Sequence, residues 1–280
     1  MHLIERIDRW GRDTPSHLAH ISGDRTLTYG ELCTRSDALA AWIEGELGDN
    51  RGPVAILGHK EPEMLIAFLA VVKSGRPYVP IDISLPAQRI NRIIETADAA
   101  LTLTPSRVAE LAIKTATATA RRVGERDPFY IIFTSGSTGE PKGVIITLAN
   151  LTAFVDWMLG EQKFAENSET FLNQAPYSFD LSVMDLYLSL VTGGTLFSLT
   201  KDDIANLKSL YEKLARSGVS TWVSTPSFAQ MCLIERSFNQ AMLPRLRRFL
   251  FCGETLAAET PRSCSIASGK PKSGIRTGRP

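Results

Sequence analysis

The amino-acid sequence predicts an α/β protein with mostly parallel sheets and helices on both faces of each sheet. Helical and extended patterns alternate over most of the 280 residues. The helical segments between extended runs are long enough for right-handed crossovers between parallel strands. The extended runs are short and apolar, which is typical of strands covered on both faces. At roughly 100–200 residues per domain, this length allows one large unit or two smaller ones.

The first half of the chain shows the alternation clearly. A helix begins at the capping box Thr28-Tyr29-Gly30-Glu31, where the Thr hydroxyl accepts from a backbone N–H and the Glu side chain reaches back. Apolar side chains recur at helical spacing to Leu47, and Gly48 can end the helix in a left-handed conformation. The next predicted elements are an extended run at 54–57, a helix over 61–74, an extended run at 78–81 and a helix over 89–97 that follows Pro86.

The second half repeats the pattern. We expect helices over 181–191 and 204–216, and extended runs at 195–199, 219–223 and 248–252. The low-complexity stretch Ala112–Ala120 is expected to form a linker or a surface loop. The last 22 residues, 259–280, contain one acidic and five basic side chains and no apolar periodicity. They form either an ordinary disordered tail or the product of an interrupted reading frame.

Composition excludes several classes of function. With 31 basic and 30 acidic residues the formal charge is +1, so we expect no nucleic-acid partner. The longest apolar run, Met64–Val72, is far shorter than the roughly 20 residues of a membrane-spanning helix, so we expect no membrane insertion. The N-terminus lacks a secretory pattern, and the four cysteines form no C-x-x-C pair. These features predict a cytoplasmic chain with reduced thiols and no metal site.

The segment Phe129–Thr147 carries the strongest functional signal. Two apolar runs flank a loop rich in Gly, Ser and Thr with one lysine, Lys142. Its glycines, Gly143 among them, can let the backbone turn sharply and point N–H groups at an anion, and the hydroxyls and the lysine add donors and charge. The order of residues differs from a Walker A loop. A nucleotide-phosphate loop and a plain glycine-rich hairpin both fit. The residues predicted to bind phosphate are Thr134, Ser135, Gly136, Ser137, Thr138, Gly139 and Lys142.

The ten residues TSGSTGEPKG resemble the signature loop of the adenylate-forming (AMP-binding) superfamily. Other landmarks of that superfamily follow in order. Leu27–Leu32 resembles its L-T-Y-x-E-L element, Lys73–Asp82 resembles K-A-G-x-x-Y-V-P-I-D, and Phe179–Ser182 resembles F-D-x-S. The stretches 173–195 and 224–256 are most similar to the branch of D-alanine–D-alanyl carrier protein ligases.

That resemblance implies an ATP-dependent reaction in two steps. D-Alanine is activated as D-alanyl-AMP, usually with Mg²⁺, and is then transferred to the phosphopantetheine thiol of a D-alanyl carrier protein for teichoic acid D-alanylation. It also implies that Asp180 holds the substrate ammonium and that Cys252 lies near the small substrate side chain. From the residues alone, Asp180 is either a buried carboxylate that needs a cation or the N-cap of its own helix. Cys252 is either a pocket residue or a structural buried thiol.

The sequence also departs from the family. The Y-G-P-T-E element, whose Glu helps to hold Mg²⁺, the T-G-D element and the catalytic lysine are absent. We therefore expect 1–258 to be a partial AMP-binding domain, 259–280 to be an aberrant tail, and the chain alone to have little ligase activity. An adenylation domain for another small amino acid and a non-catalytic nucleotide-binding remnant remain as alternatives. The four histidines show no metal spacing, and His17 and His20 are expected at the surface.

Overall fold

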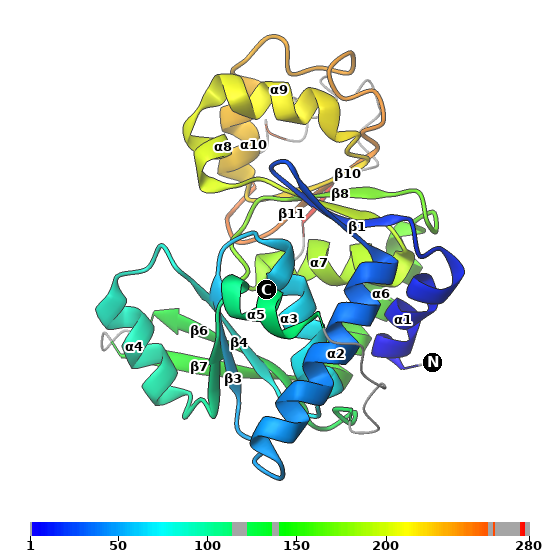
Figure 1. Ribbon diagram of the computed structural model, residues 1–280. Coiled ribbons are helices and arrows are strands. Elements are labelled where there is room, and N and C mark those ends of the chain that lie inside the picture. Colours follow the sequence, from blue (N-terminus) through cyan, green and yellow to red (C-terminus); the bar gives the residue numbers. More distant parts are fainter. Residues whose placement is uncertain (1, 114–121, 136–139, 257–259, 261–274, 278–280) are drawn as a thin grey trace. The chain divides into compact units, whose positions relative to one another are not determined.

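The computed structural model describes residues 2–113, 122–135, 140–256, 260 and 275–277. It confirms the predicted α/β class with mostly parallel sheets (Figure 1). The chain divides into two compact units. Unit 1 comprises residues 1–19, 25–163 and 176–180, and unit 2 comprises residues 20–24, 164–175 and 181–280. No helix in the described part of the chain is long and apolar enough to cross a membrane.

Unit 1 is built on a five-stranded sheet with the order β5-β3-β4-β6-β7. The strands are parallel except for β7, which pairs antiparallel with β6. The strands of this sheet are β3 (Val54–Gly58), β4 (Tyr78–Asp82), β5 (Leu101–Leu103), β6 (Pro128–Ser135) and β7 (Pro141–Thr147). Strand β2 (Arg25–Thr28) also belongs to unit 1 but not to this sheet. The helices of unit 1 are α1 (Leu3–Asp13), α2 (Tyr29–Leu47), α3 (Pro62–Lys73), α4 (Ala87–Thr96), α5 (Pro105–Leu111) and α6 (Leu148–Gln162).

Local signals explain the start and end of the longest helix. The Thr28 side chain accepts from the backbone N–H of Glu31, and the Glu31 carboxylate accepts from the N–H of Thr28, so the predicted capping box is confirmed. Gly48 follows the helix at a φ of 53°, as the sequence predicts. Helices α2, α3 and α5 cover one face of the sheet and α4 packs on the other (Figure 1).

Unit 2 is built on parallel strands in the order β12-β11-β10-β8-β9-β1. The strands are β1 (Leu18–Ser22), whose last three residues lie in this unit, β8 (Thr170–Asn173), β9 (Thr195–Ser198), β10 (Thr221–Ser224), β11 (Arg248–Phe251) and β12 (Ile275–Thr277). The helices are α7 (Leu181–Thr192), α8 (Lys201–Ala205), α9 (Leu207–Ser217) and α10 (Pro226–Leu233).

Trp222 lies at the centre of the core of unit 2. It is fully buried, and its strand register places it beside Leu172 on one side and Phe249 on the other. Residues of α9 and α10 cover this row of side chains, while α7 lies on the opposite face of the sheet (Figure 1). The expected covering of a parallel sheet on both faces is therefore present in this unit.

Residues 275–277 and the predicted linker Ala112–Ala120 lie outside the predicted helices and strands. The sequence predicts no element after residue 258, yet Ile275–Thr277 forms β12, parallel to β11. Backbone hydrogen bonds to β11 form this strand, although its sequence shows no apolar periodicity. Within the predicted linker Ala112–Ala120, residues 114–120 lie outside the described residues.

Candidate functional site

The β6–β7 hairpin of unit 1 brings together two of the predicted phosphate-binding residues. The strand register places Thr134 directly opposite Lys142, and Ser135 opposite Pro141. The side chains of Thr134 and Lys142 are both exposed, so a hydroxyl and an ammonium group face solvent at the end of the hairpin next to the connecting residues 136–139. Gly136, Ser137, Thr138 and Gly139 lie outside the described residues. The pair can donate hydrogen bonds to an anion, with one positive charge to neutralise it.

Gly143 has a different role from the one predicted. It lies inside β7 rather than in a turn, and its backbone has no positive φ. A Cβ atom at this position would lie 3.0 Å from Cγ2 of Ile131 and 3.1 Å from Cζ of Phe133, both on β6. The prediction that Gly143 turns the backbone toward an anion is therefore wrong. This glycine lets the side chains of the neighbouring strand pack over β7.

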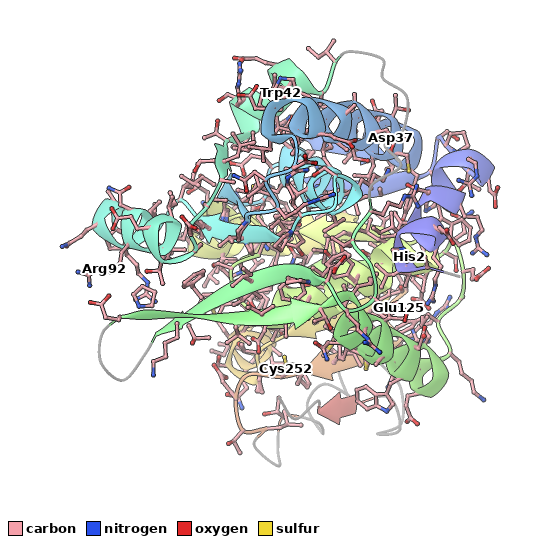
Figure 2. The ribbon with its side chains drawn as sticks, turned by 90° about the horizontal axis from the view of Figure 1, so that it is seen from below. His2, Asp37, Trp42, Arg92, Glu125 and Cys252 are labelled. Atoms are coloured by element: carbon pink, nitrogen blue, oxygen red, sulfur yellow. The ribbon has the colours of Figure 1, made fainter. Side chains whose placement is uncertain are left out.

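An exposed ion pair joins the hairpin to helix α4. Arg92 Nη1 lies 2.9 Å from Oε1 of Glu140, the residue that precedes β7. Figure 2 shows Arg92 beside the outer end of the hairpin. Since both side chains are exposed, the pair contributes little to stability, but it links the position of Glu140 to a helix packed on the same sheet.

Asp180 lies at the end of a short loop that belongs to unit 1. Tyr177 anchors this loop, because its ring packs edge-on against Phe68 and lies 4.4 Å from the Nζ of Lys60. Asp180 itself is exposed and immediately precedes α7, so the prediction of a buried carboxylate is wrong. Tyr177 occupies the buried position of the loop, which leaves Asp180 free to face solvent. Burial, together with the negative charge of Asp180, raises the pKa of Tyr130 in β6. Asp180 therefore lies close enough to Tyr130 for its charge to affect the pKa of that side chain.

A His–Asp pair at the carboxyl ends of β3 and β4 was missed by the sequence reasoning. His59 Nδ1 lies 2.6 Å from Oδ2 of Asp82, and the backbone N–H of Ser84 donates to Oδ1 at 2.9 Å. Burial alone would raise the pKa of Asp82, but the hydrogen bonds from His59 and Ser84 outweigh it and lower this pKa to about 2.

The position of this pair could have been inferred. Both residues stand at the end of an apolar run, and ligands of open α/β sheets bind at the carboxyl ends of parallel strands. Strand β6 pairs parallel with β4 at Tyr78 and Tyr130, so the carboxyl ends of both strands lie at the same end of the sheet. His59 and Asp82 therefore lie at the same end of the sheet as the connecting end of the β6–β7 hairpin.

Cys252 lies in unit 2, directly after β11 (Figure 2). Its side chain is half-buried and is not part of a disulfide. The following turn contains Gly253 at a φ of 88°, a conformation that favours glycine. The Glu254 carboxylate then accepts from the backbone N–H and the hydroxyl of Ser227 at 3.0 and 2.9 Å, at the first turn of α10. These contacts fix the turn that presents Cys252.

A series of buried hydrogen bonds lies at the carboxyl ends of β8 and β9 in unit 2. His20 Nε2 lies 2.9 Å from Oγ of Ser198, and that hydroxyl donates to Oδ1 of Asn173 at 2.8 Å. Asn173 Nδ2 in turn donates to Oδ2 of Asp185 at 2.9 Å. His20 is fully buried, so its predicted surface position is wrong. This series joins the carboxyl ends of β8 and β9 to helix α7, and satisfied polar groups of this kind hold a local geometry rigidly.

Within the described residues, no three His, Cys, Asp or Glu side chains form a group that could hold a metal ion.

Comparisons with known proteins agree with the signature loop. A family model described as AMP-binding enzyme matches residues 7–274. A D-alanine–D-alanyl carrier protein ligase of Bacillus cereus (strain B4264) is 45% identical over 94% of this chain and 55% of its own length. The relative of the same name from Bacillus mycoides (strain KBAB4) is 45% identical over 98% of this chain and 58% of its own length. The chain spans about half the length of the curated relatives it matches.

Solved structures share the fold. The nonribosomal peptide synthetase FmoA3 superposes with a TM-score of 0.89 over 100% of this chain and 31% of its own, at 23% identity. The N-terminal subdomain of Klebsiella oxytoca NpsA, solved with 3-hydroxyanthranilyl-AMSN, has a TM-score of 0.82 at 23% identity. That match covers 99% of this chain and 72% of the subdomain. At this level of identity, both similarities concern the fold alone.

Proposed function

The chain belongs to the AMP-binding enzyme family, and we propose that it carries the ATP-phosphate-binding and amino-acid-binding part of a ligase that activates D-alanine. The observation that carries the proposal is the pairing of Thr134 with Lys142 at the loop end of the β6–β7 hairpin. The 45% identity to D-alanine–D-alanyl carrier protein ligases supports the choice of amino acid.

In the proposed reaction a carboxylate oxygen of D-alanine attacks the α-phosphorus of ATP. The bond between the α- and β-phosphates breaks, pyrophosphate leaves, and D-alanyl-AMP forms. The phosphopantetheine thiol of a carrier protein then attacks the acyl carbon, and AMP leaves. This chain contributes positioning and charge neutralisation to the first step. Thr134 and Lys142 donate to the phosphate oxygens, together with Ser135 and the loop residues Gly136, Ser137, Thr138 and Gly139.

The amino acid is held by the other two predicted residues in this proposal. Asp180, exposed at the end of its loop, pairs with the ammonium group of D-alanine. Cys252 borders the small side chain, at a turn fixed by Glu254. ATP chemistry of this kind uses Mg²⁺, which binds to phosphates and to one or two carboxylates. The proposal names no residue of this chain as a ligand of the metal and assigns no step to it. ATP and reduced thiols are both cytoplasmic, which supports that location for the reaction.

Binding of D-alanine by the purified chain tests the proposal. In calorimetric titrations with a non-hydrolysable ATP analogue present, we expect D-alanine to bind more tightly than L-alanine. Asp180→Asn should weaken D-alanine binding roughly tenfold, because a hydrogen bond to a charged group contributes about 1.5–3 kcal/mol. Asp24→Asn, an exposed carboxylate elsewhere, is the matched control. Tighter binding of another small amino acid would favour an adenylation domain of different specificity, and no amino-acid binding would contradict the proposal.

A further inference from the structure

Lys60 is a buried lysine of unit 1 to which the proposed reaction gives no role. It lies in the turn between β3 and α3, and it is 1% exposed. Its Nζ lies 4.4 Å from the centre of the Tyr177 ring. Burial of an ammonium group is costly unless its charge is compensated, and the face of an aromatic ring attracts a cation. The position of the Tyr177 ring is therefore coupled to a buried charge.

The turn that carries Lys60 is held by hydrogen bonds on both sides of this residue. His59 Nδ1 lies 2.6 Å from Oδ2 of Asp82, at the end of the neighbouring strand. The backbone N–H of His59 donates to Oε2 of Glu61 at 2.6 Å, and Glu61 is the N-cap of α3. Lys60 is thus presented from a fixed part of the sheet.

Tyr177 also connects Lys60 to a group of aromatic rings. The Tyr177 ring meets Phe68 of α3 edge-on, with 5.4 Å between the ring centres. Phe68 stacks on Tyr78 of β4 at 4.4 Å, and Tyr78 lies 5.7 Å from the ring of Tyr130 in β6. Aromatic pairs of this kind contribute beyond the area that they bury. Tyr177 is therefore held by a cation and by a ring that belongs to the core of unit 1.

Asp180 lies three residues beyond Tyr177 in the same short loop. The backbone N–H of Phe179 donates to the carbonyl oxygen of Pro176 at 3.0 Å, which closes a turn around Tyr177. Asp180 directly follows this turn and is exposed. Its charge contributes to the raised pKa of Tyr130, so the carboxylate lies near the same group of rings. The anchored Tyr177 ring thus restricts where the Asp180 carboxylate can lie.

We propose that Lys60 is a positioning residue for amino-acid binding, because its contact with the Tyr177 ring holds the loop 176–180 in the conformation in which Asp180 receives the ammonium group of the substrate. The inference rests on the proposed function, since it takes Asp180 as the residue that binds this ammonium group. Lys60 itself does not touch the substrate. Without its charge, the loop must be ordered when the amino acid binds, and the cost of that ordering lowers the affinity.

Calorimetric titrations of D-alanine, with a non-hydrolysable ATP analogue present, test the role of Lys60. Lys60→Met keeps most of the side-chain length and removes the charge, and we expect D-alanine to bind roughly fivefold or more weakly. The affinity for the ATP analogue alone should stay unchanged, because the phosphate hairpin does not include this loop. The matched control is Lys73→Met, which removes another buried lysine of unit 1, one that is paired with Asp8 and Asp37. Lys73→Met should leave D-alanine binding unchanged while circular dichroism shows that the variant is folded.

A double-variant cycle separates the ring contact from general destabilisation. Tyr177→Leu removes the aromatic face, whereas Tyr177→Phe keeps it. We expect Tyr177→Leu to weaken D-alanine binding and Tyr177→Phe to retain most of the affinity. Adding Lys60→Met to Tyr177→Leu should weaken binding no further, because the contact is already lost. Fully additive effects of these two changes would overturn the proposal.

The outcomes distinguish this inference from the proposed function. If the parental chain binds D-alanine and Asp180→Asn weakens the binding, but Lys60→Met binds as tightly as the parental chain, the positioning role is wrong and the proposed function stands. Equal weakening by Lys60→Met and Lys73→Met would also overturn the positioning role. If the parental chain binds no amino acid, both the proposed function and this inference are wrong.

Discussion

The pair His59–Asp82 gives a pH-dependent prediction that can be worked out from the structure. Asp82 is 4% exposed and accepts hydrogen bonds from His59 and from the backbone of Ser84. Its pKa falls from an ordinary value of 3.8 to about 2, since the hydrogen bonds outweigh the effect of burial. At about 1.4 kcal/mol per pH unit, this lowering corresponds to about 2 kcal/mol of stability from the ionised carboxylate.

The sign of the effect follows from the direction of the shift. The folded state holds Asp82 ionised more strongly than the unfolded chain does. The stabilisation is therefore complete above pH 3.8 and is lost as the pH falls toward 2. Asp82→Asn removes the titrating group. The free energy of unfolding of the parental chain minus that of the variant should therefore be largest near neutral pH, and it should shrink by about 1 kcal/mol between pH 6 and pH 3.

Urea unfolding followed by circular dichroism at several pH values measures this difference. Asp24→Asn serves as the control, because Asp24 is exposed, and its difference from the parental chain should stay near zero throughout. If the gap between the parental chain and Asp82→Asn is the same at pH 3 as at pH 6, Asp82 does not have a lowered pKa. The hydrogen bond between His59 and Asp82 would then not contribute to the free energy of unfolding in the way worked out above.

Three further predictions concern packing and charge. Lys73 is buried within 2.8 Å of Asp8 and 2.7 Å of Asp37. Lys73→Met should lower the free energy of unfolding by about 1–3 kcal/mol, because both carboxylates lose a buried partner although Asp8 keeps its ion pair with Arg122; a loss under about 0.5 kcal/mol in urea unfolding would contradict this. Gly143→Ala should cost about 1–3 kcal/mol in the same assay, because its Cβ crowds β6. Gly160→Ala, in a helix with open space around it, should be neutral or stabilising, and equal effects of the two changes would argue against the packing role. Glu254→Gln should speed thiol labelling of Cys252, because it loosens the turn tied to Ser227, and an unchanged labelling rate would show that the turn is held by other contacts.

The sequence predicted what local chemistry determines. The capping box at Thr28 and the end of α2 at Gly48 depend on residues a few positions apart, and the capping box and the positive φ of Gly48 are confirmed, although a ψ of -119° places Gly48 outside the left-handed helical region. The signature loop was also found locally, and the strand register adds that Thr134 faces Lys142. Short apolar runs predicted β3, β4, β6, β7, β9, β10 and β11, but β1, β2, β5, β8 and β12 were missed, and the division of the strands between two sheets was not predicted.

The failures concern residues whose surroundings come from distant parts of the chain. His20 is buried because β1 pairs with β9, and its partner Ser198 is 178 residues away. Asp180 is exposed because Tyr177, three residues earlier, takes the buried position against Phe68. His59 was set aside for lack of metal spacing, although its partner Asp82 stands at the end of the neighbouring strand. Sequence periodicity reports which side chains face a core, but it does not report which strands are neighbours.

The affinity of the purified chain for ATP tests the central claim most directly. In a calorimetric titration we predict measurable ATP binding by the parental chain. Binding by Lys142→Met should be weaker by about tenfold or more, because one charge-assisted contact to phosphate is lost. Lys208→Met, which removes an exposed lysine of α9 in unit 2, should leave the affinity unchanged. No ATP binding by the parental chain, or equal affinity of the parental chain and Lys142→Met, would contradict the assignment of the β6–β7 hairpin as a phosphate site.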